Sequence, residues 1–362
     1  MPRVLITGAN GFIGANMVLH FIAAGFQVRG TVSGGKIDNF RKVVADKYPS
    51  LEAVQVDDFV KGDLTDAMKD VDAVIHVASP LPFGGAGPKD NLNTVVEGYV
   101  NVLRQAVKNG ISKVVITGSW GSALDPTLKQ AFEGLILTEK DWGSVTDEEF
   151  LAGNHDLMWT YLAARTLAER AAWDFAAKEP ALDLAIINCP MIFGPHAPGF
   201  PPPEAGPTAL TSTVHIYTLL KGAIPPPLPS LFCDVRDVAR AHLAALSVPK
   251  AESNVQDKRF LICAGFMFWK DAVKYLHHAH PELKTRLPPL DAEFAPFPGP
   301  LTTIDATRAK EKLGMVDYVD WKQTLEATVA GLLEAGKAWG ANAAVLSTGD
   351  DAVMKAYISR QK

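Results

Sequence analysis

Short runs of apolar residues alternate with longer segments in which apolar residues recur every three or four positions through the first half of the chain. The short runs predict strands and the longer segments predict helices. The predicted strands are residues 4–7, 27–32, 51–56, 73–77, 113–117 and 184–187, and the predicted helices between them are residues 12–24, 37–47, 92–107 and 157–178. Strands that are apolar throughout and alternate with helices are typical of a parallel sheet covered on both faces. The pattern therefore predicts a doubly wound α/β fold.

The chain changes character after residue 190. Residues 194–207 are dense in proline and glycine, and residues 224–229 contain four prolines, so neither segment is expected to form a central strand. Residues 232–234, with a helix predicted at 235–246, and residues 259–263 are interpreted as a return to the sheet. We therefore expect the main domain at residues 1–190 and 233–265. A smaller, discontinuous C-terminal substrate domain is expected at 191–232 and 266–340, and residues 341–362 have no assigned role.

Composition narrows the class of protein. Hydrophobic residues make up 48% and charged residues 21% of the 362, as in soluble globular proteins. The 35 Lys and Arg against 40 Asp and Glu leave a charge of −5, which argues against a nucleic-acid partner. No apolar run approaches the roughly 20 residues that span a bilayer. The three cysteines lack C-x-x-C spacing and favour a reducing compartment, so a cytoplasmic protein is expected. His76, His155, His196 and His242 have no paired spacing and the H-E-x-x-H motif is absent, so no metal site is expected.

A glycine turn follows the first predicted strand and opens the first predicted helix, where residues 7–14 read TGANGFIG. Gly8 permits the tight turn, Gly11 lets the backbone approach a pyrophosphate, and Gly14 lets the helix pack on the sheet. The amides and the dipole at the start of such a helix attract phosphate. The turn therefore predicts a dinucleotide site, the alternative being a glycine-rich turn without a ligand.

A second group of residues suggests carbonyl chemistry. Tyr161 and Arg165 stand four residues apart on a predicted helix, which places the phenol and the cation on one face. Reduction of a carbonyl needs a proton donor, and a neighbouring cation stabilises the phenolate that a tyrosine leaves behind. Ser119 ends the fifth predicted strand, at the edge where α/β sheets bind ligands. The alternative is that these are ordinary helix and turn-capping residues.

Several of these segments resemble the extended short-chain dehydrogenase/reductase family. They are the T-G-x-x-G-x-x-G turn, residues 76–80 (HVASP) and residues 232–242 (FCDVRDVARAH). Residues 28–31, 57–58 and 168–175 (AERAAWDF) are similar to fungal NADPH-dependent aldehyde/ketone reductases, which are relatives of the plant dihydroflavonol reductases. The resemblance covers about residues 4–246 and implies a Rossmann fold with a nicotinamide cofactor.

The resemblance also implies roles for the three catalytic candidates. Ser119 would hydrogen-bond the substrate oxygen, with Ser122 as the alternative, and Tyr161 would donate the proton. Arg165 stands where the family has Lys. Arginine keeps the positive charge and can bond the nicotinamide ribose, but it releases a proton far less readily. We expect either a reductase with altered pH dependence or a protein that has lost catalytic power.

The cofactor expected is NADP (NADPH) rather than NAD. The segment after the second predicted strand carries no carboxylate for a ribose 2′-hydroxyl. Similar reductases carry Arg where this chain has Ser33, and Lys36 or Arg29 could supply the missing charge. Asp58 and Phe59 resemble the pair that contacts adenine, and Asp63 competes for the role of Asp58. The remaining cofactor contacts implied are Gly8, Asn10, Gly11, Phe12, Ile13, Gly14, Ala78, Ser79, Pro80, Thr117, Tyr161, Arg165, Pro190 and Ile192.

The substrate candidates are apolar or aromatic, namely Phe83, Trp120, Trp159 and Met191. They favour a small hydrophobic carbonyl compound over a nucleotide sugar, although each is also a common core residue. The function predicted is an NADPH-dependent reductase of a hydrophobic aldehyde or ketone, acting as a monomer or homodimer. The alternatives are a non-catalytic NADP(H)-binding protein and an NAD(P)-dependent epimerase, dehydratase or lyase.

Overall fold

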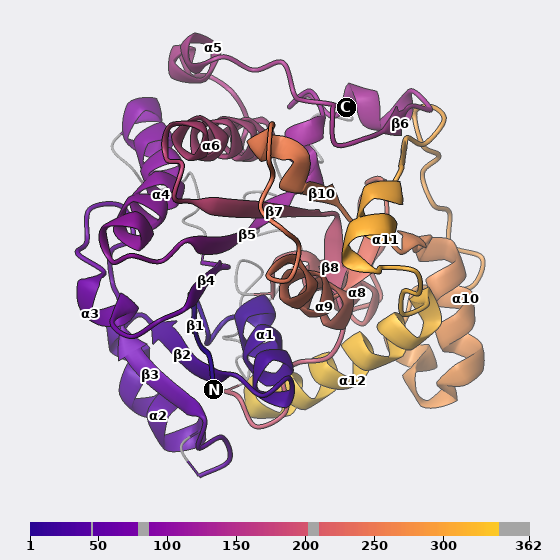
Figure 1. Cartoon of the computed structure of the whole chain (residues 1–362). Coiled ribbons are helices and arrows are strands. Elements are labelled where there is room, and N and C mark those ends of the chain that lie inside the picture. The colour runs from indigo at the N-terminus through magenta and orange to yellow at the C-terminus, as the bar shows by residue number, and fades with distance from the viewer. Residues whose placement is uncertain (45, 79–86, 202–209, 340–362) are drawn as a thin grey trace.

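The computed structural model describes residues 1–44, 46–78, 87–201 and 210–339 (Figure 1). Seven strands form one sheet in the order β10-β7-β5-β4-β1-β2-β3, and every neighbouring pair is parallel. The strands are β1 (Arg3–Ile6), β2 (Gln27–Val32), β3 (Leu51–Gln55), β4 (Ala73–His76), β5 (Lys113–Ser119), β7 (Asp183–Cys189) and β10 (Arg259–Leu261). The predicted doubly wound fold is confirmed.

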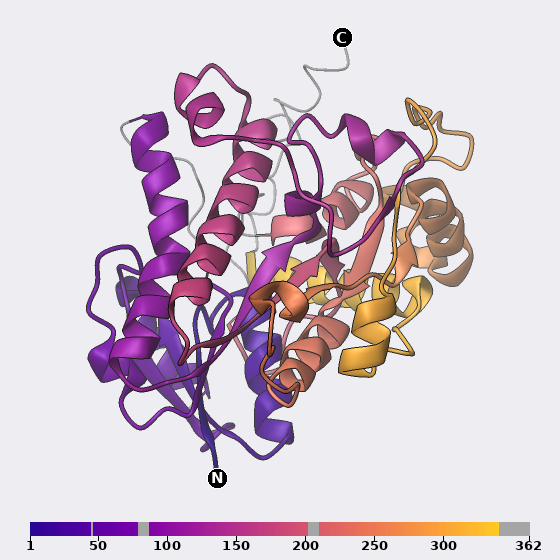
Figure 2. The same ribbon diagram turned by 45° about the horizontal axis from the view of Figure 1, so that its top comes forward.

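Helices cover both faces of this sheet because side chains of a strand alternate between the faces. Val4 and Ile6 join the core beneath one set of helices, and Leu5 joins the core beneath the other. The first set is α1 (Phe12–Ala23), α2 (Ile37–Val44), α9 (Val235–Ala245) and α11 (Thr307–Leu313). The second set is α3 (Thr65–Met68), α4 (Pro88–Lys108) and α6 (Leu157–Lys178). Both views show α4 and α6 lying side by side (Figure 2).

A second group of elements gathers beside the sheet. Strands β8 (Met191–Phe193), β9 (Leu231–Asp234) and β11 (Gly265–Phe266) form a separate sheet in the order β11-β9-β8. The prediction that residues 232–234 return to the central sheet is therefore wrong, because β9 pairs with β8 and β11 instead. The prediction for residues 259–263 is confirmed by β10, which pairs with β7. The division into two domains stays a prediction.

The helices of this second region enclose a core of their own. They are α8 (Val214–Leu219), α10 (Trp269–Ala279) and α12 (Trp321–Trp339), and the core between them contains Phe193, Phe232 and Trp269. Two further strands, β6 (Ile136–Leu137) and β12 (Thr303–Ile304), pair with each other, and α5 (Asp147–Ala152) precedes α6.

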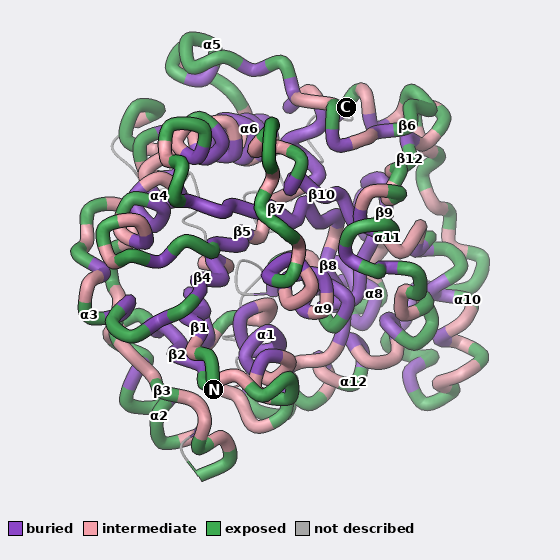
Figure 3. The backbone as a smooth tube through the Cα atoms, viewed as in Figure 1, coloured by how far each residue is buried: buried purple, intermediate pink, exposed green. Residues whose placement is uncertain are grey.

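Burial follows the layers, since the strands of the central sheet are largely buried while outward helix faces and connecting loops are exposed (Figure 3). None of the helices in the described part of the chain combines the length and the apolar composition needed to cross a bilayer. The His, Cys, Asp and Glu side chains of those residues form no group of three or more that could hold a metal ion.

Candidate active site

The glycine turn between β1 and α1 has the shape of an anion cradle. Gly8 lies in the left-handed region with φ of +69°, and its N–H donates to the Thr31 hydroxyl at 2.9 Å. A Cβ on Gly14 would lie 2.1 Å from the carbonyl oxygen of Gly8, so only glycine fits there. Helix α1 begins after Gly11 with no side-chain cap from the described residues. Its first amides are therefore available to an anion, and the turn fits the pyrophosphate of a dinucleotide.

The turn meets the end of β4 where the strand order reverses between β1 and β4. The Thr7 hydroxyl oxygen accepts from the N–H groups of Val77 and Ala78, each at 2.9 Å. Both lone pairs are then in use, so the Thr7 hydroxyl donates to Nδ1 of His76 at 2.9 Å and His76 carries its proton on Nε2. Burial, together with the charge of Arg165, lowers the pKa of His76 to about 3. These bonds fix the carboxyl edge of the sheet at its switch point.

The predicted cofactor contacts around the glycine turn differ in their neighbours. Asn10, Phe12 and Ile13 are half-buried along the turn, and Phe12 makes an edge contact with the ring of His196 at 5.8 Å between centroids. Ala78 lies against Gly8. Ser79, Pro80 and Phe83 lie outside the described residues.

Helix α6 brings the phenol and the cation together. The Arg165 guanidinium carbon lies 5.2 Å from the centre of the Tyr161 ring and 6.0 Å from that of Tyr99 on α4. Arg165 Nη1 donates to the Tyr99 phenol at 3.4 Å, and that phenol donates to the carbonyl of Thr117 at 3.1 Å. Arg165 is buried while Tyr161 is half-buried, so the cation sits behind the phenol. Sequence reasoning missed Tyr99, because only the packing of α4 on α6 brings it to Arg165.

Ser119 ends β5 close to the same helix. Its hydroxyl oxygen accepts from the N–H of Gly121 at 3.2 Å. Gly121 is pressed against Leu162, the residue after Tyr161, since a Cβ on this glycine would lie 2.4 Å from the Leu162 side chain. The short 3-10 helix η2 (Trp120–Ala123) therefore holds Ser119 against the start of α6.

The alternative serine has a different environment. Ser122 is fully buried, and its hydroxyl contacts the Ser119 carbonyl at 2.8 Å, the Glu169 carboxylate and Nη2 of Arg259 at 3.2 Å. Ser119 is half-buried. This arrangement favours Ser119 over Ser122 as the hydroxyl that meets a substrate.

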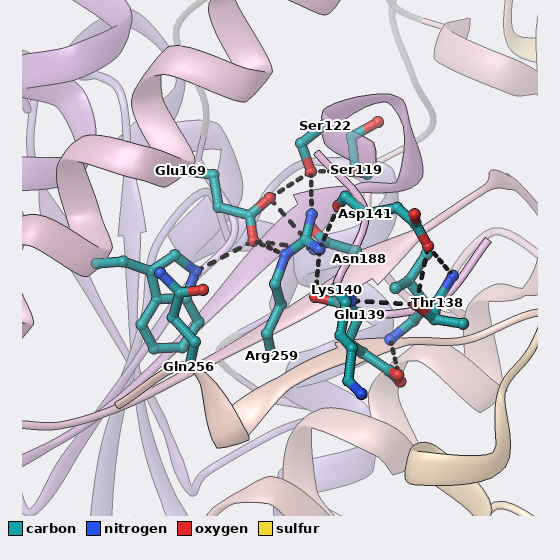
Figure 4. A network of polar contacts seen from close by, with 12 residues as sticks. Ser119, Ser122, Thr138, Glu139, Lys140, Asp141, Glu169, Asn188, Gln256 and Arg259 are labelled. Carbon is teal, nitrogen blue, oxygen red and sulfur yellow. Dashed lines mark hydrogen bonds and ion pairs between the residues drawn. The ribbon is translucent and has the colours of Figure 1, made fainter. Parts of the chain in front are cut away.

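A buried ionic network lies behind these residues (Figure 4). Glu169, two turns along α6 from Tyr161, accepts hydrogen bonds from Trp173 at 3.2 Å, Asn188 at 3.0 Å and Arg259 at 2.8 Å. Arg259 on β10 also donates to the carbonyls of Glu139 and Asp141 and lies 3.9 Å from the centre of the Trp142 ring. The network joins α6, η2, β7 and β10. Arg259 is a charged residue at the start of an apolar strand, and such a residue indicates a buried partner of opposite charge. The sequence does not identify Glu169 as that partner.

The carboxylates proposed for adenine differ in their surroundings. Asp58 accepts from the N–H groups of Val60 and Lys61, at 2.7 and 3.0 Å, and so caps the turn after β3. Asp63 instead accepts from Thr65 at 2.9 Å and pairs with Lys108 of α4 at 3.4 Å. Because these contacts hold Asp63 on the side of α3 and α4, Asp58 is the better candidate for the adenine contact.

Phe59 and Thr117 lie further inside. The Phe59 ring packs toward His76, with centroids 5.8 Å apart, and its carbonyl accepts from Asn101 at 3.0 Å. The Thr117 hydroxyl donates to Nε2 of His242 at 2.8 Å, because Nδ1 of that ring donates to a backbone carbonyl.

Of the cations considered near the adenosine ribose, Arg29 faces elsewhere. Its guanidinium pairs with Glu52 at 2.9 Å and donates to the backbone carbonyls of Ala67 in α3 and Lys69 just after it. Ser33 and Lys36 are both exposed in the segment after β2.

The substrate candidates fall in different clusters. Trp120 is buried beside Tyr161 and Leu162. Trp159 packs instead with Phe150 and stacks on His155, with ring centroids 3.5 Å apart. Pro190 is buried in the connection between β7 and β8.

Two further candidates follow Pro190 in β8. Met191 is half-buried against the core of the second region. Ile192 is buried, and its N–H donates to the Ser212 hydroxyl at 3.4 Å.

Comparisons with known proteins agree with this architecture. Residues 4–262 match the model of the NAD dependent epimerase/dehydratase family. The chain is 32% identical over 350 residues to the ketoreductase azaE of Aspergillus niger, covering 92% of this chain and 98% of that protein. It is 30% identical to a putative NADPH-dependent methylglyoxal reductase of Candida albicans, covering 91% and 98%.

A solved structure has a similar fold. The crystal structure of Gre2 from Candida albicans in complex with NADPH is 27% identical to the chain. It aligns with a TM-score of 0.74 over 92% of this chain and 99% of that one.

Proposed function

The chain belongs to the NAD dependent epimerase/dehydratase family, and on that premise we propose that it is an oxidoreductase that reduces a hydrophobic aldehyde or ketone with NADPH. The names of its relatives, a ketoreductase and an NADPH-dependent methylglyoxal reductase, support both the reaction and the cofactor. The observation that carries the proposal is the contact of the Arg165 guanidinium with the Tyr161 ring, on the helix that also supports Ser119.

Each of the three residues has a distinct part in the reaction. Ser119 donates a hydrogen bond to the carbonyl oxygen and holds it beside the phenol. Tyr161 transfers its phenolic proton to that oxygen as negative charge develops there. Arg165 keeps its charge throughout and stabilises the phenolate that remains. NADPH, when bound, supplies the hydride. Because arginine holds its proton, Tyr161 regains its own from solvent rather than through the side chain of residue 165.

The substrate proposed is small and apolar. Tyr161 packs against the core cluster that contains Trp120, Leu124 and Leu162, and apolar neighbours exclude water from a developing charge. Met191, the first residue of β8, is a further candidate for contact with the substrate.

The presence of Arg165 in place of lysine favours one competing function, a protein that binds the dinucleotide without turnover. Both functions predict binding of NADPH, so the consumption of NADPH separates them. An epimerase, dehydratase or lyase would also show no net consumption of NADPH, and a cofactor that co-purifies with the chain in one oxidation state would distinguish it from the non-catalytic protein.

The test is NADPH oxidation across a panel of hydrophobic aldehydes and ketones. Turnover that Tyr161→Phe abolishes and Arg165→Lys retains or raises supports the reductase. Tyr275→Phe, whose phenol contacts Glu326 from α10, is the matched control and leaves turnover unchanged. Unchanged turnover in Tyr161→Phe would show that the proton donor is wrongly assigned. Binding without turnover that Arg165→Lys fails to restore would support the non-catalytic function.

A further inference from the structure

The parallel pairing of β2 and β3 places a carboxylate beside the segment that follows β2. Val32 is paired with Gln55 in register, so Gly34 and Asp57, each two residues further on, meet at the carboxyl edge of the sheet. Asp57 Oδ1 accepts from the N–H of Gly34 at 2.5 Å, and its Oδ2 accepts from the Gln55 side chain at 2.5 Å. The contact is tight, because a Cβ on Gly34 would lie 2.5 Å from the Gln55 side chain and 3.0 Å from Asp57.

This position matters for a dinucleotide. In the doubly wound fold the adenosine ribose lies at the end of the second strand, where an acidic residue binds a 2′-hydroxyl and an arginine binds a 2′-phosphate. Here the segment after β2 reads Ser33-Gly34-Gly35-Lys36, which has one cation and no carboxylate of its own. The carboxylate comes instead from the segment after β3, 23 residues later in the chain, and only the pairing of β2 with β3 places it beside Gly34.

Asp57 is held in its charged form. Hydrogen bonds from the Gln55 side chain and then from the Gly34 amide lower the pKa of the Asp57 carboxyl below its usual value. Asp58, the next residue, uses its carboxylate to cap the following turn. Asp57 is thus the carboxylate that faces the end of β2.

We propose that Asp57 is a specificity-determining residue that acts against the 2′-phosphate of NADPH. Its carboxylate occupies the Gly34 amide, which would otherwise be a donor for that phosphate, and it adds negative charge beside a dianion. Lys36 opposes this effect from the other end of the segment. The chain therefore discriminates between NADPH and NADH less strongly than its remaining residues would allow. This inference rests on the proposed function only in requiring that a nicotinamide dinucleotide binds.

The test measures binding and needs no substrate. Asp57→Asn removes the charge but keeps an oxygen that accepts from Gly34, and Asp57→Ala removes both. Fluorescence titration of the whole chain gives the dissociation constants for NADPH and NADH. We expect NADPH to bind about tenfold more tightly to Asp57→Asn, as removal of one charge a few Å from a phosphate predicts, and NADH to change less than twofold. Adenosine 2′,5′-bisphosphate should gain in the same way as NADPH, and AMP should not.

Asp63→Asn is the matched control. Asp63 is also an exposed carboxylate that accepts from neighbouring backbone and hydroxyl groups, but it pairs with Lys108 on α4. Asp63→Asn changes the net charge by the same amount as Asp57→Asn and should leave the NADPH-to-NADH affinity ratio unchanged.

Three results would overturn the inference. The first is an NADPH-to-NADH affinity ratio in Asp57→Asn and Asp57→Ala that stays within twofold of the original. The second is an equal gain in affinity for both nucleotides. The third is the same gain in NADPH affinity in Asp63→Asn. An Asp57-dependent ratio in a chain that turns over no carbonyl would leave the inference standing and refute only the reductase. No binding of either nucleotide to any of these proteins would refute both.

Discussion

Arg165 on α6 donates a hydrogen bond to the phenol of Tyr99 on α4 at 3.4 Å, and its guanidinium lies near the rings of both Tyr99 and Tyr161. The Tyr99 phenol in turn donates to the Thr117 carbonyl near the end of β5. The cation is therefore tied to two other elements as well as to its own helix. A guanidinium is longer and more directional than an ammonium, so such contacts decide where its charge lies.

Tyr99→Phe should weaken this positioning. The Thr117 carbonyl and Arg165 each lose a partner, so we expect the free energy of unfolding to fall by about 1 kcal/mol in urea denaturation. In the proposed reductase, kcat should fall about threefold, with a smaller change in KM, because the charge that stabilises the phenolate is less fixed. The double variant Tyr99→Phe/Arg165→Lys provides the discriminating measurement. If Tyr99→Phe lowers kcat by the same factor when residue 165 is lysine, Tyr99 does not act through Arg165.

Local patterns account for the parts of the fold that were predicted. Helix α6 has the predicted bounds because Asp156 caps it and Lys178 ends its periodic pattern before Glu179 and Pro180. The prediction places strand β9 in the wrong sheet because a run of three apolar residues before a helix looks the same whichever strand it pairs with. Its partner β11 is only two residues long, too short to carry a pattern.

The same distinction holds for the candidate site. The proximity of Tyr161 to Arg165 follows from their spacing on one helix. Tyr99 and Asp57 reach the site only through the packing of α4 on α6 and the register of β2 with β3. Tertiary contacts of this kind leave no periodic trace in a single sequence.

Glu169→Gln should destabilise the fold strongly. Arg259 is fully buried and Glu169 is its ion-pair partner, so the amide leaves a buried guanidinium without its counter-charge. Breaking such a pair costs about 3–5 kcal/mol in the free energy of unfolding. The matched control is Glu97→Gln, which breaks the more exposed pair with Arg104 and should cost less than about 1 kcal/mol. Equal losses in the two variants, measured by urea denaturation, would contradict a special role for the buried network.

Three buried histidines should make the stability depend on pH. Burial lowers the pKa of His76 to about 3 and those of His215 and His242 to about 4, from the usual 6.5. Below pH 6.5 these three histidines become protonated in the unfolded chain but stay neutral in the folded chain. The stability is therefore fully present above that pH and is lost as the pH falls toward 4, by about 1.4 kcal/mol per pH unit for each histidine.

Urea denaturation between pH 8 and pH 5 measures this dependence. His242→Gln can still accept from Thr117 and donate to the backbone, and it should reduce the slope below pH 6.5 by about 1.4 kcal/mol per pH unit. His278→Gln, at an exposed position on α10, should leave the slope unchanged. A slope in His242→Gln equal to that of the unaltered chain would show that His242 does not stay neutral in the folded state.

Alanine at two glycines of the turn should separate binding from folding. A Cβ on Gly14 would lie 2.1 Å from the Gly8 carbonyl oxygen and 2.7 Å from its carbon, so Gly14→Ala forces the turn to move and should destabilise the chain by at least 1 kcal/mol. Gly11 is exposed and has φ of −85°, and the one described atom within 4 Å of a Cβ there is the Gly8 oxygen, at 3.3 Å. Gly11→Ala should therefore fold with a stability within about 0.5 kcal/mol of the original.

The methyl group of Gly11→Ala nevertheless enters the place where the pyrophosphate approaches the backbone, so the affinity for NADPH should fall more than about tenfold. Gly336→Ala, in α12, where no atom of the described residues lies within 4 Å of the added Cβ, is the control and should leave NADPH binding unchanged. Fluorescence titration gives the NADPH affinity of the three variants, and urea denaturation gives their free energy of unfolding. If Gly11→Ala binds NADPH as tightly as the original chain, the pyrophosphate does not lie on this turn, since a methyl group at that point leaves no room for both.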